Sequence, residues 1–298
     1  MGTRAHLIVD APARHLIADA VAKLRDWNGR WTRFDDSSEL SALNHAEGRP
    51  VVVSTDTAAL IALAIDAWRV TDGAFDPTVH DTLVRAGYGR PFAAGPTEPG
   101  AAVDVPGPAA IECDPSTGLV HAPAHVRVDL GGIAKGHAAD LLVRDLLERG
   151  ATGAAVTIGG DTAVGGRCPF ADAWPIVADL EPSEPVAHLE RGGFCFSTTQ
   201  RRRWVTAAGP AHHLIDPRTG RPADSGVTTA AIAASTAAAA EVFATACVVV
   251  GWPAARQLAE GAGLSGFVVT DLGERHDIGV LAQNPPESAT RADGRRRE

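Results

Sequence analysis

The sequence predicts a protein of mixed α and β structure. Apolar residues recur at helical spacing in residues 14–27, 55–71 and 135–149, which indicates helices with one buried face. Short segments such as residues 125–130 and 153–161 are rich in Val, Ile and Leu and either alternate with polar residues or end in a glycine pair, as strands do. With 298 residues, the chain suffices for one large domain or two small ones around a sizeable core.

The individual elements follow from these patterns in chain order. Helices are expected at residues 14–27, 37–44, 55–71, 135–149 and 236–251, several of which have cap-type residues or a glycine at their ends. Strands are expected at residues 125–130, 153–161, 174–180, 194–198 and 227–234. Three further segments are predicted to lack regular structure: a turn at 73–83, a surface excursion at 93–108 and a disordered polar tail at 283–298.

The composition limits the partners and the compartment. A formal net charge of −9 argues against a general nucleic-acid or anionic membrane surface, so a phosphate ligand needs a local site. No run approaches the roughly 18 apolar residues of a membrane-spanning helix. The first residues lack the regions of a signal peptide, which predicts a cytoplasmic protein without direct membrane insertion. The four cysteines are widely spaced and predict neither a zinc site nor a disulfide framework.

The segment "DLGGIAKG" at residues 129–136 has several features of a phosphate loop. No Ser or Thr follows Lys135, as a P-loop requires, and the adjacent Gly131 and Gly132 do not fit the dinucleotide fingerprint. Backbone amides next to glycine, a helix N-terminus and a cation remain, and these favour an anion. The alternative is a tight strand-to-helix turn with an exposed lysine.

Three other segments combine polar residues with turn signals. "TIGGD" places Asp161 after a glycine pair, and "GAFDPTV" places Asp76 and Thr78 around a proline. "HHLIDPRTGRPAD" at residues 212–224 contains two histidines, either of which could act as a general base near neutral pH. Each segment also fits a plain turn, in which an aspartate accepts hydrogen bonds from nearby backbone amides.

The helix predicted at 236–251 carries two polar residues on one face. Glu241 and Thr245 are four residues apart, and their apolar surroundings predict burial, so the carboxylate needs a partner. A carboxylate and a hydroxyl one turn apart are suitable ligands for Mg²⁺. The alternative is a glutamate favoured by the helix dipole, with the hydroxyl of Thr245 bonded to its own helix backbone.

Taken together and in this order, the segments resemble the ApbE family of FAD:protein FMN transferases. The resemblance runs from "MGT" through "WTRFDDSSELSALN", "GAFDPTV", "DLGGIAKGHAAD", "TIGGD" and "HHLIDPRTGRPA" to "AEVFATACVVVG", which ends at Gly251. It implies one flavin transferase domain over residues 1–282, with a two-lobed, T-fold-like α+β fold of twisted, mostly antiparallel sheets and flanking helices. It also implies Mg²⁺-dependent transfer of FMN from FAD to a threonine of an acceptor protein, with release of AMP.

The same resemblance assigns roles to residues. His213 is the implied base that deprotonates the acceptor threonine. The backbone carbonyl of Ala134 and the side chains of Glu241 and Thr245 are the implied Mg²⁺ ligands. The residues implied to bind or support the flavin nucleotide are Ser38, Asn44, Asp76, Thr78, Lys135, Gly160, Asp161, Ser197, Ile215 and Asp216.

Two departures from the family pattern bear on function. The family usually has Asp at the position of Glu241, whose extra methylene moves the carboxylate by roughly 1.5 Å, so Mn²⁺ is an alternative metal. The segment "FCFSTTQRRRW" at residues 194–204 replaces the usual Thr-Ser-Gly segment. Two other functions therefore stay open: a metal-dependent FAD pyrophosphatase, with water in place of threonine, and a non-catalytic FAD-binding protein.

Overall fold

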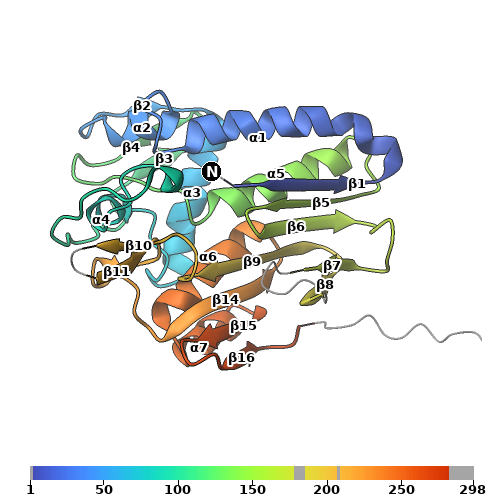
Figure 1. Ribbon diagram of the computed structural model, residues 1–298. Coiled ribbons are helices and arrows are strands. Elements are labelled where there is room, and N and C mark those ends of the chain that lie inside the picture. The colour runs from blue at the N-terminus through green and yellow to red at the C-terminus, as the bar shows by residue number, and fades with distance from the viewer. Residues whose placement is uncertain (1–2, 178–184, 207–208, 282–298) are drawn as a thin grey trace, which may run out of the picture.

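A seven-stranded antiparallel sheet organises the chain (Figure 1). The computed structural model describes residues 3–177, 185–206 and 209–281. In spatial order the strands of the large sheet are β1 (Ala5–Val9), β5 (Gly153–Ile158), β6 (Asp161–Gly166), β9 (Gly192–Thr198), β14 (Val227–Ala234), β15 (Ser265–Thr270) and β16 (Arg275–Ile278). Every strand pairing among the described residues is antiparallel, which confirms the predicted sheet type.

Two long helices cover one face of this sheet. Helix α5 (Ala134–Glu148) packs on β5 and β6, and α6 (Ala237–Val250) packs on β9 and β14. The two helices also contact each other, and a Cβ at Gly136 would lie only 2.4 Å from the Ala237 carbonyl oxygen. A glycine at this position therefore permits the close approach of α5 to α6.

The remaining helices lie around this centre. Helix α1 (Ile17–Trp31) runs alongside α5, and α7 (Ala254–Gly261) follows α6 and packs against β15 and β16 (Figure 1). The other helical elements are the 3₁₀ helices η1 (Ala11–Leu16) and η2 (Phe92–Ala94) and the helices α2 (Glu39–Asn44), α3 (Thr55–Val70) and α4 (His80–Arg85). No helix among the described residues is long and apolar enough to cross a membrane.

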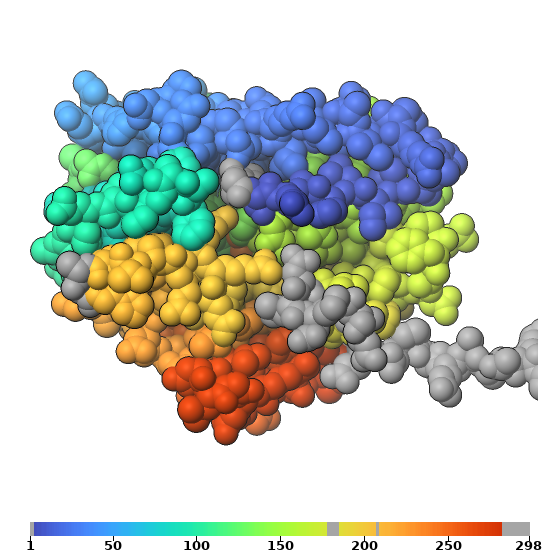
Figure 2. All heavy atoms as spheres, in the orientation of Figure 1, coloured from blue at the N-terminus to red at the C-terminus, as the bar shows by residue number. Residues whose placement is uncertain are grey.

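Short strand pairs complete the structure at the periphery. They are the three-stranded sheet β2 (Val51–Val52), β4 (Leu119–His121) and β3 (Glu112–Asp114), and the pairs β7 (Trp174–Ile176) with β8 (Ala187–Leu189), β10 (Arg203–Thr206) with β11 (Gly209–His212) and β12 (Ile215–Asp216) with β13 (Arg221–Pro222). The β10–β11 pair lies beside the segment around residue 90 on one face of the molecule (Figure 2), where the Trp204 indole donates a hydrogen bond of 2.7 Å to the Ala86 carbonyl. Segments more than a hundred residues apart thus meet here.

The predicted helices are confirmed, with shifts at their ends. The helix expected at 14–27 starts as the 3₁₀ helix η1 and continues as α1 to Trp31, and the segment 73–83 ends in the start of α4 rather than in turn alone. The strands expected near 174–180, 194–198 and 227–234 correspond to β7, β9 and β14. Residues 178–184 and the predicted tail at 283–298 lie outside the described residues.

The strand predicted at residues 125–130 is wrong. These residues form no strand or helix, although Val126, Val128 and Leu130 are buried as the alternation suggested. The reason is that a side chain satisfies the backbone: Asn44 accepts a hydrogen bond from the Val128 amide at 2.7 Å and donates one to the Val128 carbonyl at 2.8 Å. The segment is therefore held by α2 instead of by a neighbouring strand.

The buried apolar residues form a core of two clusters. Its largest cluster combines apolar residues of α1, α3, α5 and α6 with those of the central strands. All four cysteines are free, and Cys168, Cys195 and Cys247 are buried, as small apolar residues are.

Candidate functional site

One cavity of about 610 Å³ lies where the N-terminal helices, the glycine segment and the sheet meet. Its walls come from α1 and the residues that follow it, from the segment between α3 and β3, from the start of α5, from the β5–β6 turn, from β9 and its following turn, and from α6. This size and the mixture of apolar, aromatic and charged walls suit a small-molecule ligand.

Most of the predicted site residues line this cavity. They are Asp76, Ala134, Lys135, Gly160, Asp161, Ser197, His213, Ile215, Glu241 and Thr245. They come from segments up to 169 residues apart, the separation of Asp76 and Thr245. The structure therefore brings together the motifs that the sequence offered separately.

The other four predicted residues are absent from the cavity wall and support it from behind. Ser38 caps α2 by accepting the Ser41 amide at 2.9 Å, and Asn44 holds the segment before the glycines, as described above. Thr78 donates to Asp76 at 2.6 Å and accepts the Gly107 amide at 3.0 Å. Asp216 is paired with Arg218 at 2.9 Å. These side chains position the segments that carry the cavity residues.

The glycine segment turns into α5 directly at the cavity. The Asp129 carboxylate accepts the Gly131 amide at 2.7 Å and pairs with the buried Arg33 guanidinium at 2.6 Å. A Cβ at Gly132 would lie 3.0 Å from the Phe75 ring and 3.9 Å from the Thr245 hydroxyl. A side chain at this position would therefore project into the space between the glycine segment and α6.

A lysine and two carboxylates form the buried centre of the cavity. The Lys135 ammonium contacts the Asp161 carboxylate at 2.5 Å and also pairs with the Glu241 carboxylate. The second oxygen of Glu241 accepts the Gly136 amide at 2.8 Å. Both carboxylate side chains are only 2% exposed, and the Asp161 Oδ1 atom has no hydrogen-bond partner among the described residues. The lysine predicted as exposed in the alternative interpretation is thus largely buried.

Burial and charge act against each other in this centre. Burial alone would lower the pKa of Lys135, but the negative charges of Asp161 and Glu241 outweigh it, so the pKa of this lysine lies above its ordinary value. Burial raises the pKa of Glu241, and the lysine and the Gly136 amide oppose that rise only in part. One ammonium shared by two carboxylates stabilises one negative charge well and leaves the second costly.

An aspartate of α5 fixes the helix that carries Glu241. Asp140 accepts the Ala237 and Ala238 amides at 2.8 and 2.9 Å, and Thr236 caps the same helix by accepting the Ala239 amide at 3.1 Å. Burial raises the pKa of Asp140 to about 6. Because Asp140 and Lys135 lie on one helix, this bond sets Glu241 against Lys135.

His213 lies in the cavity wall directly after β11. Burial lowers the pKa of His213 well below its ordinary value, and the positive charges of Arg202, His212 and Lys135 act in the same direction. Its ring is therefore neutral at physiological pH and able to accept a proton. Its Nδ1 atom is buried and has no hydrogen-bond partner among the described residues.

The predicted metal ligands lie on facing sides of the same space. Ala134 begins α5, Glu241 and Thr245 are one turn apart on α6, and the Thr245 hydroxyl is 2.9 Å from that of Ser197. Among the described residues no three His, Cys, Asp or Glu side chains group as a metal site would. A carbonyl, a carboxylate, a hydroxyl and the unpartnered Asp161 oxygen nevertheless form a set of hard oxygen donors that fits Mg²⁺. The alternative interpretation of these two residues is not favoured, since Glu241 is the fifth residue of the helix rather than part of its first turn and the Thr245 hydroxyl contacts Ser197.

Sequence reasoning missed an aromatic wall of the cavity. Trp31 lines the cavity and stacks on Trp27, with ring centroids 5.5 Å apart. Phe34 and Tyr88 line it as well, and the Arg33 guanidinium lies 4.2 and 4.8 Å from their ring centroids. Tryptophans four residues apart on the helix predicted at 14–27 and its continuation were the available signal.

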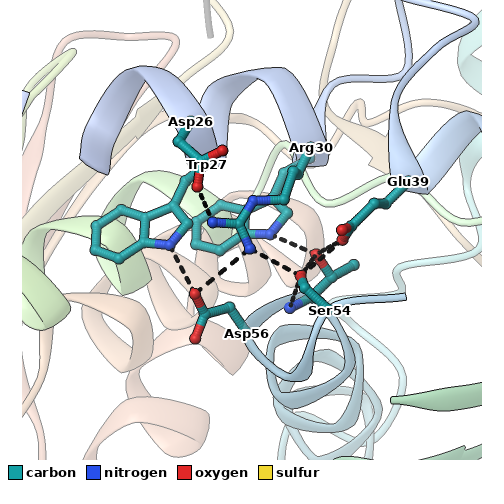
Figure 3. Close-up of polar contacts among 8 residues, drawn as sticks. Asp26, Trp27, Arg30, Glu39, Ser54 and Asp56 are labelled. Atoms are coloured by element: carbon teal, nitrogen blue, oxygen red, sulfur yellow. Dashed lines mark hydrogen bonds and ion pairs between the residues drawn. The ribbon is translucent and has the colours of Figure 1, made fainter. Parts of the chain in front are cut away.

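A hydrogen-bonded network behind Trp31 fixes this wall (Figure 3). The Trp31 indole donates to the Thr57 hydroxyl at 3.0 Å, and Thr57 in turn donates to the Glu39 carboxylate. The Ser54 hydroxyl donates to the same carboxylate at 2.7 Å and accepts from Arg30 at 2.9 Å. Helices α1, α2 and α3 are thereby tied together beside the cavity.

The fold and the cavity define an α+β protein with a site large enough for a nucleotide-sized ligand. Comparison with known proteins narrows this class. The chain belongs to the ApbE family, whose sequence profile matches residues 1–268.

Curated relatives carry one functional name. The FAD:protein FMN transferase of Haemophilus influenzae is 27% identical, and the match covers 92% of this chain and 86% of the relative. The FAD:protein FMN transferase of Salmonella typhimurium is 26% identical, with 81% of this chain and 73% of the relative covered.

Solved structures share the fold. The ApbE protein of Thermotoga maritima matches with a TM-score of 0.82 and 26% identity, and 93% of this chain and 94% of that one are covered. The flavin transferase ApbE of Vibrio cholerae matches with a TM-score of 0.75 and 24% identity, with 94% of each chain covered. The predicted α+β, ApbE-like fold is therefore confirmed.

Proposed function

We propose that this chain transfers FMN from FAD to a hydroxyl group of an acceptor protein and releases AMP. The observation that carries the proposal is the cavity itself, in which a buried lysine–carboxylate centre and a neutral histidine face one space. The names of the curated relatives and of the matching Vibrio structure support the same activity. We further propose that the acceptor hydroxyl belongs to a threonine.

The proposed reaction exchanges the phosphoanhydride bond of FAD for a phosphoester bond to the acceptor. The threonine oxygen attacks the phosphorus that is bonded to the riboflavin half of FAD, and a new O–P bond forms. The bond from this phosphorus to the bridging oxygen breaks, and AMP leaves with that oxygen. The hydroxyl proton goes to a ring nitrogen of His213, which burial keeps neutral and which lines the cavity. A positioned base of this kind contributes a rate factor of about 10²–10⁴.

Other residues of the cavity bind and orient the substrate. Lys135 holds the centre against which the pyrophosphate lies, and the Gly131 and Gly132 backbone allows it to approach closely. The rings of Trp31, Phe34 and Tyr88 offer flat apolar surfaces for the aromatic parts of FAD. Asp76 is buried at the same wall, and burial raises the pKa of this carboxyl against the opposing hydrogen bonds from Thr78.

We propose that Ala134, Glu241 and Thr245 hold Mg²⁺, with Mn²⁺ as the alternative because Glu241 is longer than aspartate. When bound, the metal ion neutralises negative charge on the phosphates. The donor set fits such an ion, since all three residues offer hard oxygen atoms and Glu241 is buried beside the unpartnered oxygen of Asp161.

The test uses the two neighbouring histidines as a matched pair. His212 is turned away from the cavity wall, where one of its ring nitrogens lies 3.0 Å from the Ala223 carbonyl, and His213 lines the cavity. Purified protein is incubated with FAD, Mg²⁺ and a candidate acceptor protein, and transfer is read as flavin fluorescence of the acceptor in a denaturing gel. We expect transfer by the wild type and by His212→Gln, and a loss of about 10²-fold or more in His213→Ala.

FAD binding separates a lost base from a lost fold. We expect His213→Ala to bind FAD nearly as tightly as the wild type, measured by quenching of flavin fluorescence. Transfer by His213→Ala at the wild-type rate would show that the proposed base is wrong. Absence of AMP release by the wild type with every divalent cation tested would instead favour a non-catalytic FAD-binding protein.

A further inference from the structure

The turn between β9 and β10 places two arginines at the cavity. Residues 201–203 form the run Arg-Arg-Arg, and Arg201 and Arg202 line the cavity. Arg203 begins β10, is exposed and does not belong to the wall. The run therefore offers two arginines to the site and a third next to it.

Arg202 is held in an unfavourable backbone conformation. Its φ of +47° lies in the left-handed region, which only two other non-glycine residues adopt in the described parts of the chain, Glu47 and Asp72. Such a conformation costs about 1–3 kcal/mol and persists where the surroundings enforce it. Here β9 precedes the turn, and Trp204 anchors its far side through the Ala86 hydrogen bond and the ring of Tyr88, at a centroid distance of 5.5 Å. The fold thus holds Arg202 at the cavity in spite of the strain in its backbone.

The positive charge of Arg202 acts on His213, the proposed base. After burial itself, Arg202 is the strongest influence that lowers the pKa of His213, ahead of His212 and Lys135. Arg202 and Lys135 are therefore both close enough to act on the same imidazole, so the space beside His213 has positive groups around it.

The lysine centre does not by itself attract an anion. Lys135 carries one positive charge, and its two carboxylate partners offset that charge fully or exceed it. A dianionic pyrophosphate needs further positive charge from the protein or from a metal ion. An arginine is suited to this task, since its planar guanidinium donates two parallel hydrogen bonds to a phosphate and stays charged at all physiological pH values.

We propose that Arg202 binds a phosphate of FAD next to His213 and is a substrate-binding residue of this chain. The inference rests on the proposed function for the identity of the ligand. It assigns to Arg202 the recognition of the phosphate that riboflavin lacks and both FMN and FAD carry.

The test compares ligands that differ by the phosphate. Dissociation constants for FAD, FMN and riboflavin are measured by flavin fluorescence for the wild type and for Arg202→Gln, Arg202→Gly and Arg203→Gln. Arg202→Gly is included because glycine adopts a positive φ without strain and keeps the turn intact. Arg203→Gln removes the same charge at the adjacent position and is the matched control.

We expect both Arg202 variants to bind FAD and FMN about 10-fold to 100-fold more weakly, the range of a lost charged hydrogen bond. Riboflavin binding should change by less than about 2-fold in all variants, since no phosphate is involved. Arg203→Gln should leave all three affinities unchanged. Thermal unfolding of each variant, compared with the wild type, shows that the fold is retained.

Other patterns overturn the proposal. An equal loss for riboflavin would mean that Arg202 shapes the cavity without contacting phosphate. The same loss in Arg203→Gln would mean a general effect of charge, and no loss in either Arg202 variant would mean that the phosphates lie elsewhere. Failure of the proposed function is seen separately, because the wild type would then show no transfer of flavin while the comparison of FMN with riboflavin still reports on Arg202.

Discussion

Two polar clusters flank the cavity, and they differ in how far their carboxylates are hydrogen-bonded within the protein. In the network behind Trp31, the Glu39 carboxylate accepts from the hydroxyls of Ser54 and Thr57, which in turn accept from Arg30 and Trp31 (Figure 3). Only the Arg30 Nε atom of this network is buried without a partner among the described residues. In the lysine centre, the Asp161 Oδ1 atom and the nearby His213 Nδ1 atom are buried without a partner among the described residues.

This difference separates polar groups that stabilise the fold from polar groups that bind a ligand or react. A network in which the carboxylate and both hydroxyls are paired within the protein fixes the side chains that it joins. Buried polar atoms without partners cost free energy, and at Asp161 and His213 they lie on residues that line the cavity, where a bound group can complete them. We therefore regard the network behind Trp31 as a rigid wall and the lysine centre as the place where ligand binding and chemistry occur.

Removal of Lys135 should have the largest effect. Lys135→Met leaves Asp161 and Glu241 buried without their cation, and we expect a loss of about 3–5 kcal/mol in the free energy of unfolding. Urea unfolding measures it. Addition of Mg²⁺ should restore part of the loss, because a second cation then lies beside the carboxylates.

The other lysine of the chain provides the control. Lys23 pairs with Asp145 at 2.5 Å, but its side chain is 42% exposed. Lys23→Met should therefore change stability by less than about 1 kcal/mol, with no response to Mg²⁺. Equal losses in the two variants would contradict the distinction between the centre and the surface.

The pH dependence of stability should reveal the burial of His137. This residue lies half a turn after Lys135 on α5, and its ring centroid is 5.9 Å from that of Trp31. Burial lowers the pKa of His137 to about 4 from 6.5. Between these values the unfolded chain binds a proton that the folded chain does not, so acid favours unfolding. Relative to the wild type, His137→Gln should gain about 2–3 kcal/mol as the pH falls from 6.5 to 4.

Asp140 on the same helix should show the opposite sign. Burial raises the pKa of Asp140 from 3.8 to about 6, so between these values the folded chain binds the extra proton. Relative to the wild type, Asp140→Asn should become less stable as the pH falls from 6 to 4. Urea unfolding at a series of pH values gives both difference curves, and equal signs for the two variants would contradict the account.

A change in the network behind Trp31 should affect the stability of the protein more than the rate of the reaction. Thr57→Val removes the acceptor of the Trp31 indole and a donor to Glu39, and we expect a loss of about 2 kcal/mol in the free energy of unfolding. The turnover number for AMP release should stay within about 3-fold of the wild type, because no reacting group is altered. A large fall in turnover with stability unchanged would show that this network takes part in the reaction.

The smallest effect on stability is expected where two caps hold one helix. Asp140→Asn and Thr236→Ala should each cost about 1 kcal/mol, as caps of α6 do. Only Asp140→Asn should also raise the Mg²⁺ concentration needed for half-maximal activity, because Asp140, unlike Thr236, ties the start of α6 to the helix of Lys135. A parallel metal response in Thr236→Ala would show that capping by itself accounts for it.

The sequence predicted the long elements well because their patterns are local. Helix α6 has a cap at Thr236 and a glycine at its end, and its bounds were predicted to within a residue. The segment at 125–130 failed because Asn44, more than eighty residues away, supplies the hydrogen bonds that a neighbouring strand would have given. A contact of this kind leaves no trace in a local pattern.

The site was predictable where a residue type carries the chemistry. Lys135, Glu241 and His213 were found from motifs and family resemblance, and the structure gathers them in one cavity. Trp31 and Arg202 were missed because an aromatic residue on a helix or a run of arginines fits a core or a surface equally well. The pairing of Glu241 with Lys135 was also unforeseen, since it depends on the contact of α5 with α6.

The most direct test of the central claim is the stoichiometry of the reaction. The wild type is incubated with FAD, a divalent cation and an acceptor protein, and AMP, free FMN and protein-bound flavin are quantified by chromatography and mass spectrometry. The account predicts one protein-bound flavin for each AMP, no free FMN, and no AMP when the acceptor is omitted. Equal amounts of AMP and free FMN, formed with or without the acceptor, would contradict it and identify a pyrophosphatase.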